Sequence, residues 1–121
     1  MKILLVDDDA FLRDMYATKF TEAGDEVAVA TDGQKALALA GEESFDVIIT
    51  DMVMPGISGV ELLEQIKEME TSAKSVCIIL SNQGEQEDID AANAAGADGY
   101  IIKAESIPSE VVTKVHNIAK Q

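Results

Sequence analysis

The chain has 121 residues, of which 47% are hydrophobic and 26% are charged, and its formal net charge is −14. These values are typical of one globular domain with its own core, and we expect a single domain over residues 1–121. So acidic a surface argues against direct binding of nucleic acid and against adhesion to anionic membranes. No apolar stretch is long enough for a signal peptide or a membrane span, and the single Cys77 cannot form an internal disulfide, so we expect a cytoplasmic protein.

Five short apolar runs predict β-strands, at residues 3–6, 27–30, 47–49, 76–80 and 100–102. The third run is apolar without alternation, which is typical of a strand whose two faces are both buried in a parallel sheet.

Between these runs, apolar residues recur at the spacing of α-helices. The first helix is expected over 10–23 before Gly24, the second from a cap at Thr31 or Asp32 to Gly41, the third after a capping box of Ser58 and Glu61, the fourth over 86–95 and the fifth over 108–119. The residues expected to face the sheet include Tyr16, Phe20, Ala23, Val60, Leu63, Ile66, Ala92, Val111, Val112 and Val115. Arg13 and His116 are expected on the solvent sides of their helices.

Five strands that alternate with five helices predict an α/β fold with one parallel sheet and helices on both faces. In such a sheet, ligands bind at the edge formed by the carboxyl ends of the strands. The polar residues that follow the predicted strands therefore define the candidate site.

Acidic residues follow two of these strands: Asp7 and Asp8 come after the first, and Asp51 after the third. Carboxylates crowded at one edge repel each other unless a cation balances them. Oxygen ligands from few protein groups favour Mg²⁺ over Zn²⁺. Ser81 after the fourth strand and Lys103 after the fifth can contact a phosphoryl group, so the set predicts a phosphoryl site with Mg²⁺. Neutralising Asp7 or Asp8 is expected to stabilise the metal-free protein.

The segments LLVDDD, IITDMVMPGISG, LSN and GYIIKA, in this order and at these spacings, resemble the receiver domain of two-component response regulators. The resemblance covers essentially the whole chain. It implies a flavodoxin-like, doubly wound fold with five parallel strands in the order 2-1-3-4-5. It also implies a signalling module, of the stand-alone chemotaxis type, that catalyses only its own phosphorylation and slow dephosphorylation.

By this resemblance, Asp51 accepts a phosphoryl group from a histidine kinase or a phosphotransfer protein. Asp8, Asp51 and the Val53 backbone carbonyl would bind Mg²⁺, with help from Asp7 through water. Ser81 and Lys103 would contact the phosphoryl group. Tyr100 occupies the family's aromatic switch position, and a switched surface at the fourth helix, fifth strand and fifth helix would bind a downstream effector protein.

One position departs from the usual pattern of the family. Ala104 replaces the proline that commonly follows the lysine, and we expect a trans bond there, since a cis bond to a non-proline residue costs about 3 kcal/mol. Val53 and Gln83 flank the path of the hydrolytic water in this family, and neither side chain can act as a base. A long-lived phosphoaspartate is therefore predicted.

Two other functions remain open at this point. The D-x-D spacing of Asp7 and Asp9 also occurs in small haloacid-dehalogenase-like phosphatases, although Phe11 does not fit their pattern. Alternatively, the chain is a pseudo-receiver that binds partners without being phosphorylated. The sequence does not identify the kinase or the effector.

Overall fold

Five parallel strands form a single sheet in the computed structural model, which describes residues 1–82 and 84–120. The strands are β1 (Lys2–Val6), β2 (Glu26–Ala30), β3 (Val47–Thr50), β4 (Val76–Ser81) and β5 (Gly99–Ile102), and their order is β2-β1-β3-β4-β5. Every neighbouring pair is parallel. This is the flavodoxin-like, doubly wound sheet that the sequence led us to expect.

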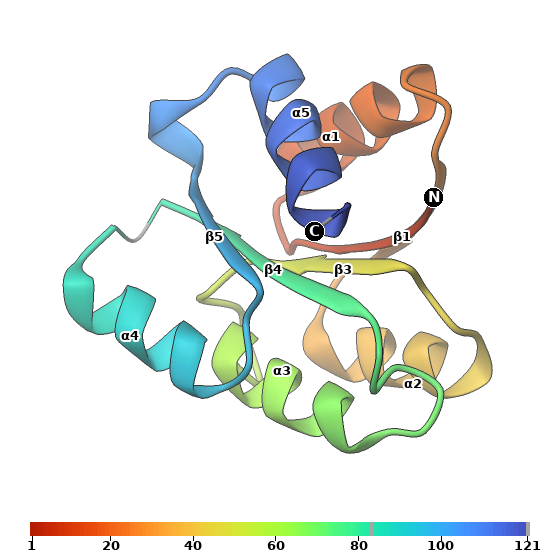
Figure 1. Cartoon of the computed structure of the whole chain (residues 1–121), viewed down its shortest axis with the longest axis vertical. Coiled ribbons are helices and arrows are strands. Elements are labelled where there is room, and N and C mark those ends of the chain that lie inside the picture. The colour runs from red at the N-terminus through yellow and green to blue at the C-terminus, as the bar shows by residue number, and fades with distance from the viewer. Residues whose placement is uncertain (83, 121) are drawn as a thin grey trace.

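Helices cover both faces of the sheet (Figure 1). Helices α1 (Ala10–Glu22) and α5 (Pro108–Ala119) lie side by side on one face, while α2 (Gly33–Glu42), α3 (Gly59–Glu68) and α4 (Gln86–Ala94) cover the other. A short 3-10 helix, η1 (Lys103–Glu105), follows β5 directly. Among the described residues, none of the helices is long and apolar enough to cross a membrane.

The central strands contribute to two hydrophobic clusters, one on each side of the sheet. In β1, Leu4 and Val6 belong to the cluster under α2, α3 and α4, whereas Ile3 and Leu5 belong to the cluster under α1 and α5. Ile48 of β3 lies in the first cluster and Ile49 in the second. Because these strands are apolar without alternation, their side chains can pack into the hydrophobic clusters on both faces of the sheet, as in other buried parallel strands.

Side-chain caps fix where three helices begin. Asp9 accepts a hydrogen bond from the Leu12 amide at the start of α1 (3.1 Å), and Asp32 caps α2 through the Lys35 amide (2.9 Å). Ser58 and Glu61 form the predicted capping box of α3. These caps confirm the helix starts expected from the sequence and pin them just beyond the carboxyl ends of β1, β2 and β3.

Several details of the helices differ from expectation. Helix α2 continues through Gly41 to Glu42, because Gly41 keeps a helical backbone and the chain turns extended only at Glu43. Ala23 is exposed because α1 ends at Glu22, one residue before it. On α3, Leu62 is fully buried and Val60 only partly so, since the buried stripe is centred between Leu62 and Ile66.

His116 is half-buried instead of exposed. Its Nε2 lies 2.6 Å from Oδ2 of Asp25, a buried carboxylate at the start of β2 whose other oxygen is 3.1 Å from the Met1 amine. The His116 ring also packs edge-on against Phe20 of α1, with 6.2 Å between ring centroids. This contact joins α5 to the amino end of the sheet, opposite the candidate site. An isolated polar residue in a helix carries no sequence signal for such a partner.

Candidate functional site

The polar residues selected from the sequence meet at one edge of the sheet. Val6 of β1 pairs with Thr50 of β3, so the residues that follow them, Asp7 and Asp51, leave adjacent strands at the same level. Ser81 is the last residue of β4, and Lys103 follows β5. Common register at the carboxyl ends therefore gathers groups that lie far apart in the chain.

Three carboxylates form a cluster there. One oxygen from each of Asp7, Asp8 and Asp51 lies within 4.8 Å of the others, with Asp7 buried, Asp51 partly buried and Asp8 exposed. Hard oxygen donors that are open to water on one side fit Mg²⁺, which keeps several water ligands. Val53, two residues after Asp51, is 60% exposed, and the metal role of its carbonyl stays a prediction.

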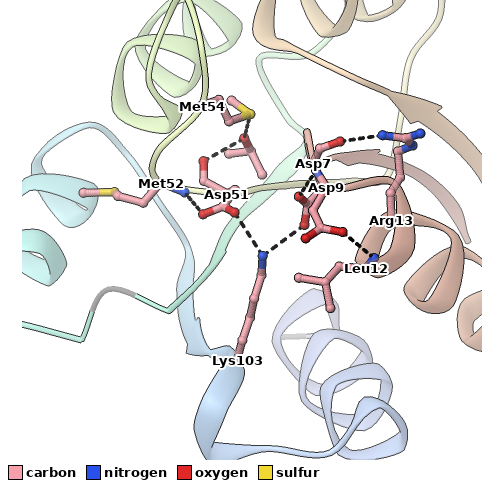
Figure 2. Close-up of polar contacts among 9 residues, drawn as sticks. Asp7, Asp9, Leu12, Arg13, Asp51, Met52, Met54 and Lys103 are labelled. Atoms are coloured by element: carbon pink, nitrogen blue, oxygen red, sulfur yellow. Dashed lines mark hydrogen bonds and ion pairs between the residues drawn. The ribbon is translucent and has the colours of Figure 1, made fainter.

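Lys103 bridges two of the acids (Figure 2). Its Nζ donates to Asp7 Oδ2 and to Asp51 Oδ2, both at 3.0 Å, and its side chain is only 6% exposed. Burial is the largest single influence on the pKa of Lys103 and lowers it, but the hydrogen bonds and the negative charges of Asp51 and Asp7 together raise it by more, so the pKa stands above its ordinary value. The ammonium therefore stays charged between two carboxylates. The peptide bond to Ala104 is trans, as predicted, and no cis bond occurs in the described residues.

Every polar group of Asp7 forms a hydrogen bond. Its amide donates to the Ala30 carbonyl (3.2 Å), and its carbonyl accepts from Nη1 of Arg13 (3.0 Å). Its Oδ1 accepts from the Asp9 amide (2.9 Å), and its Oδ2 accepts from Lys103. Asp7 is therefore a fixed part of the site, whereas no hydrogen bond to the Asp8 carboxylate is formed by any residue that the structure describes.

The backbone around Asp51 is also fixed. Thr50, which is fully buried, donates its hydroxyl to the Asp51 carbonyl (3.0 Å), and the Met52 amide donates to Asp51 Oδ1 (2.7 Å). Gly59, the first residue of α3, packs against the same carbonyl and donates its amide to the Met52 carbonyl (2.9 Å). The loop after β3 thus holds the Asp51 carboxylate in a set direction.

Ser81 and Tyr100 lie in contact. Ser81 is 1% exposed, and Tyr100 is half-buried on the neighbouring strand β5. Burial raises the pKa of Tyr100, and the nearby Ser81 side chain acts in the opposite direction. The structure brings the two proposed switch residues together, while switching itself stays a prediction. Gln83 lies outside the described residues.

Sequence reasoning missed two residues of the site. Arg13 was placed on the solvent side of its helix, yet it is half-buried and bound to Asp7. Its position four residues after the Asp9 cap, on the turn that faces the loop after β1, was the available signal. Thr50 lies one residue past the predicted strand 47–49 and was given no role, since nothing in the sequence pattern marks a hydroxyl that binds the next carbonyl.

A doubly wound sheet with three acids and a buried lysine at its carboxyl edge is the arrangement expected of a receiver domain. The family model of the response regulator receiver domain matches residues 3–116, and the chain belongs to this family. The resemblance noted from the four motifs is confirmed.

Two relatives are similar to the chain over nearly its whole length. The chain is 35% identical to the chemotaxis protein CheY of Thermotoga maritima over 120 residues, which is 98% of each protein. It is 34% identical over 119 residues to the phosphate regulon transcriptional regulatory protein PhoB of Pseudomonas aeruginosa. That match covers 98% of this chain and 52% of PhoB, so the chain spans about half the length of several curated relatives.

Solved structures show the same fold. Chemotaxis protein CheY4 of Vibrio cholerae superposes with a TM-score of 0.91 at 31% identity, over 97% of both chains. The BeF3-activated receiver domain of DrrB, from Thermotoga maritima, superposes with a TM-score of 0.86 at 28% identity, over 99% of this chain and 97% of that one.

Proposed function

We propose that Asp51 accepts a phosphoryl group from a histidine kinase or a phosphotransfer protein, in a reaction that needs Mg²⁺. The observation that carries this proposal is the position of Asp51, fixed by its backbone contacts and joined to Lys103 beside Asp7 and Asp8. A carboxylate oxygen of Asp51 attacks phosphorus in line, the bond from phosphorus to the donor nitrogen breaks, and that nitrogen takes up a proton. Residues 1–121 act as one receiver domain.

The remaining residues of the site would balance the charge of the phosphoryl group and hold it in position. Mg²⁺ bound by Asp8, Asp51 and the Val53 carbonyl, with Asp7 nearby, would neutralise charge that develops on the phosphoryl oxygens. Lys103 is already beside Asp51 and can pair with a phosphoryl oxygen after a small movement. Ser81 donates its hydroxyl to another such oxygen. Little else is required from the protein, because phosphoryl transfer depends mainly on positioning and electrostatics.

Output follows from the contact between Ser81 and Tyr100. If Ser81 turns toward a phosphoryl group, its contact with Tyr100 changes, and Tyr100 lies on β5 between α4 and α5. The surface of α4, β5 and α5 is then the one that a downstream effector protein recognises. We place this signalling in the cytoplasm, where a buried free thiol such as Cys77 stays reduced.

The geometry disfavours a phosphatase of the haloacid-dehalogenase type. In that reading Asp7 would be the nucleophile and Asp9 its acid partner. Asp7 is only 2% exposed, whereas Asp51 is partly exposed, and Asp9 is engaged as the cap of α1. Neither carboxylate is free to act as that mechanism demands.

The test is phosphorylation by acetyl phosphate, followed by intact-mass spectrometry. The wild type should gain the mass of one phosphoryl group in Mg²⁺ and none in EDTA. Asp51→Asn should gain none, while Asp14→Asn, which changes an exposed carboxylate on α1, should behave as wild type. A labelled Asp51→Asn protein would place the acceptor elsewhere. An unlabelled wild type would favour a pseudo-receiver, and turnover of a phosphomonoester would favour a phosphatase.

A further inference from the structure

Arg13 is the only arginine in the chain, and its guanidinium is bound to the turn of residues 7–9, which follows β1. Nη1 donates to the Asp7 carbonyl at 3.0 Å, and the side chain is partly buried against the turn (Figure 2). The Asp7 carbonyl lies just past the end of β1, where no further strand pairing is available to it. A side chain from α1 therefore supplies the donor that the sheet does not.

This hydrogen bond closes a small ring of contacts around residues 7–9. The Asp9 amide donates to Asp7 Oδ1, and the Arg13 amide donates to the Asp9 carbonyl at 2.9 Å. Asp7 and Asp9 are thus both held, and the residue between them, Asp8, is directed outward with an exposed carboxylate. The direction of Asp8 depends on the shape of the turn, because its own side chain has no hydrogen-bond partner in the described part of the chain.

We infer that Arg13 is a positioning residue for Mg²⁺: it holds the turn of residues 7–9 in the form that presents Asp8 to the ion. This inference rests on the proposed Mg²⁺ site. Mg²⁺ requires nearly ideal octahedral coordination, and the loss of a group that orients the ligands of a metal lowers its affinity about 10- to 100-fold.

Charge and geometry make opposite predictions about Arg13. A cation beside three carboxylates opposes the arrival of Mg²⁺, so removal of the Arg13 charge should tighten Mg²⁺ binding if only the charge matters. If the hydrogen bond to Asp7 matters more, its removal frees the turn, Asp8 samples more directions, and Mg²⁺ binds more weakly. The sign of the change separates the two effects.

The experiment measures the Mg²⁺ dissociation constant by isothermal titration calorimetry without any phosphodonor. Arg13→Gln should weaken Mg²⁺ binding roughly tenfold, the scale on which residues that orient ligands act. Arg13→Lys keeps the charge but lacks the planar guanidinium, and should also bind Mg²⁺ more weakly than wild type. Lys19→Gln removes an exposed positive charge from the same helix and should leave the constant nearly unchanged.

Each possible result either supports or overturns the positioning role of Arg13. Binding by Arg13→Gln that is as tight as wild type, or tighter, overturns the inference. If Arg13→Gln does not fold by circular dichroism, Arg13→Lys takes its place, and unchanged affinity in that variant overturns the inference equally. A wild type that binds no Mg²⁺ overturns the proposed metal site itself, and the inference with it.

Discussion

Gly59 packs so closely on Asp51 that a Cβ atom at position 59 would lie 2.2 Å from the Asp51 carbonyl oxygen. Backbone is the obstacle, so no side-chain rotation relieves the clash. We predict that Gly59→Ala lowers the free energy of unfolding by about 1 to 3 kcal/mol and displaces the loop after Asp51, the proposed phosphoryl acceptor.

Gly41 provides the matched control for this substitution. It lies within helix α2, and a Cβ there would meet only the Met69 methyl group at 3.7 Å. Gly41→Ala should therefore stabilise the protein by about 0.5 to 1 kcal/mol. Urea unfolding of both variants measures the contrast, and equal stabilities would show that the approach of Gly59 to Asp51 is not tight in solution.

Asp7 and Asp8 should respond oppositely to neutralisation. From the sequence, both substitutions were expected to stabilise the metal-free protein. In EDTA, Asp8→Asn should stabilise it by roughly 1 kcal/mol, or about 4 °C, because only repulsion is lost. Asp7→Asn should instead destabilise it by about 2 to 3 kcal/mol, because Asp7 is buried and paired with Lys103.

Thermal melts in EDTA distinguish these cases, and a Mg²⁺ titration adds a second readout. Asp8→Asn should weaken Mg²⁺ binding as well as raise the melting temperature. If Asp8→Asn leaves both quantities unchanged, Asp8 does not belong to the site. If Asp7→Asn melts higher than wild type, repulsion outweighs the ion pair with Lys103.

Lys103 should contribute to stability over most of the accessible pH range. Its pKa is raised in the folded protein, so its contribution is complete below the ordinary lysine value of 10.5 and is lost as the pH rises through the folded value. In EDTA, Lys103→Met should be less stable than wild type by about 3 kcal/mol, since two carboxylates lose their partner. The difference in melting temperature between wild type and Lys103→Met should stay constant from neutral pH upward. It should narrow only at the alkaline end of the range.

Lys114→Met serves as the control, because Lys114 is exposed and, among the described residues, hydrogen-bonds only to the Ser106 hydroxyl. Its melting temperature should differ little from that of wild type at any pH. A gap for Lys103→Met that closes already near neutral pH would mean that Lys103 is not charged between the acids.

The phosphoryl group on Asp51 should be long-lived. Val53 is exposed and offers the hydrolytic water no hydrogen bond. The double variant Val53→Asn with Gln83→Glu should lose its phosphoryl group at least about tenfold faster, because a base and a polar partner can then orient that water. Val53→Ala should keep the wild-type lifetime. Phosphate release after removal of acetyl phosphate gives the rates, and no acceleration in the double variant would assign the water to other groups.

The sequence predicted the sheet, the helix caps and the site acids because each depends on local chemistry. Buried strands need unbroken apolar runs, caps need a polar side chain at a helix start, and parallel strands deliver whatever follows them to one edge. Asp51 and its neighbours were found by this reasoning, without any knowledge of distances.

The missed features depend on partners that are distant in the chain or on the angle of a helix. Arg13 and Asp7 are near in sequence, but their contact depends on how α1 leaves the turn. Asp25 and His116 are 91 residues apart and meet only because α5 packs beside α1. Burial of Leu62 in place of Val60 reflects a rotation of α3 that a period of 3.6 residues does not specify.

The acids at the end of β1 have a further effect on how the sheet is assembled. A strand that is apolar on both faces does not specify its own register with the neighbouring strands. A shift by one residue turns each side chain to the opposite face, and both faces are apolar. Asp7 breaks this degeneracy. Shifted into the sheet, its charge would enter a dry layer away from Lys103, at a cost that an apolar strand cannot recover. The acids of the proposed metal site therefore also set the alignment of β1 with β2 and β3 as the chain folds.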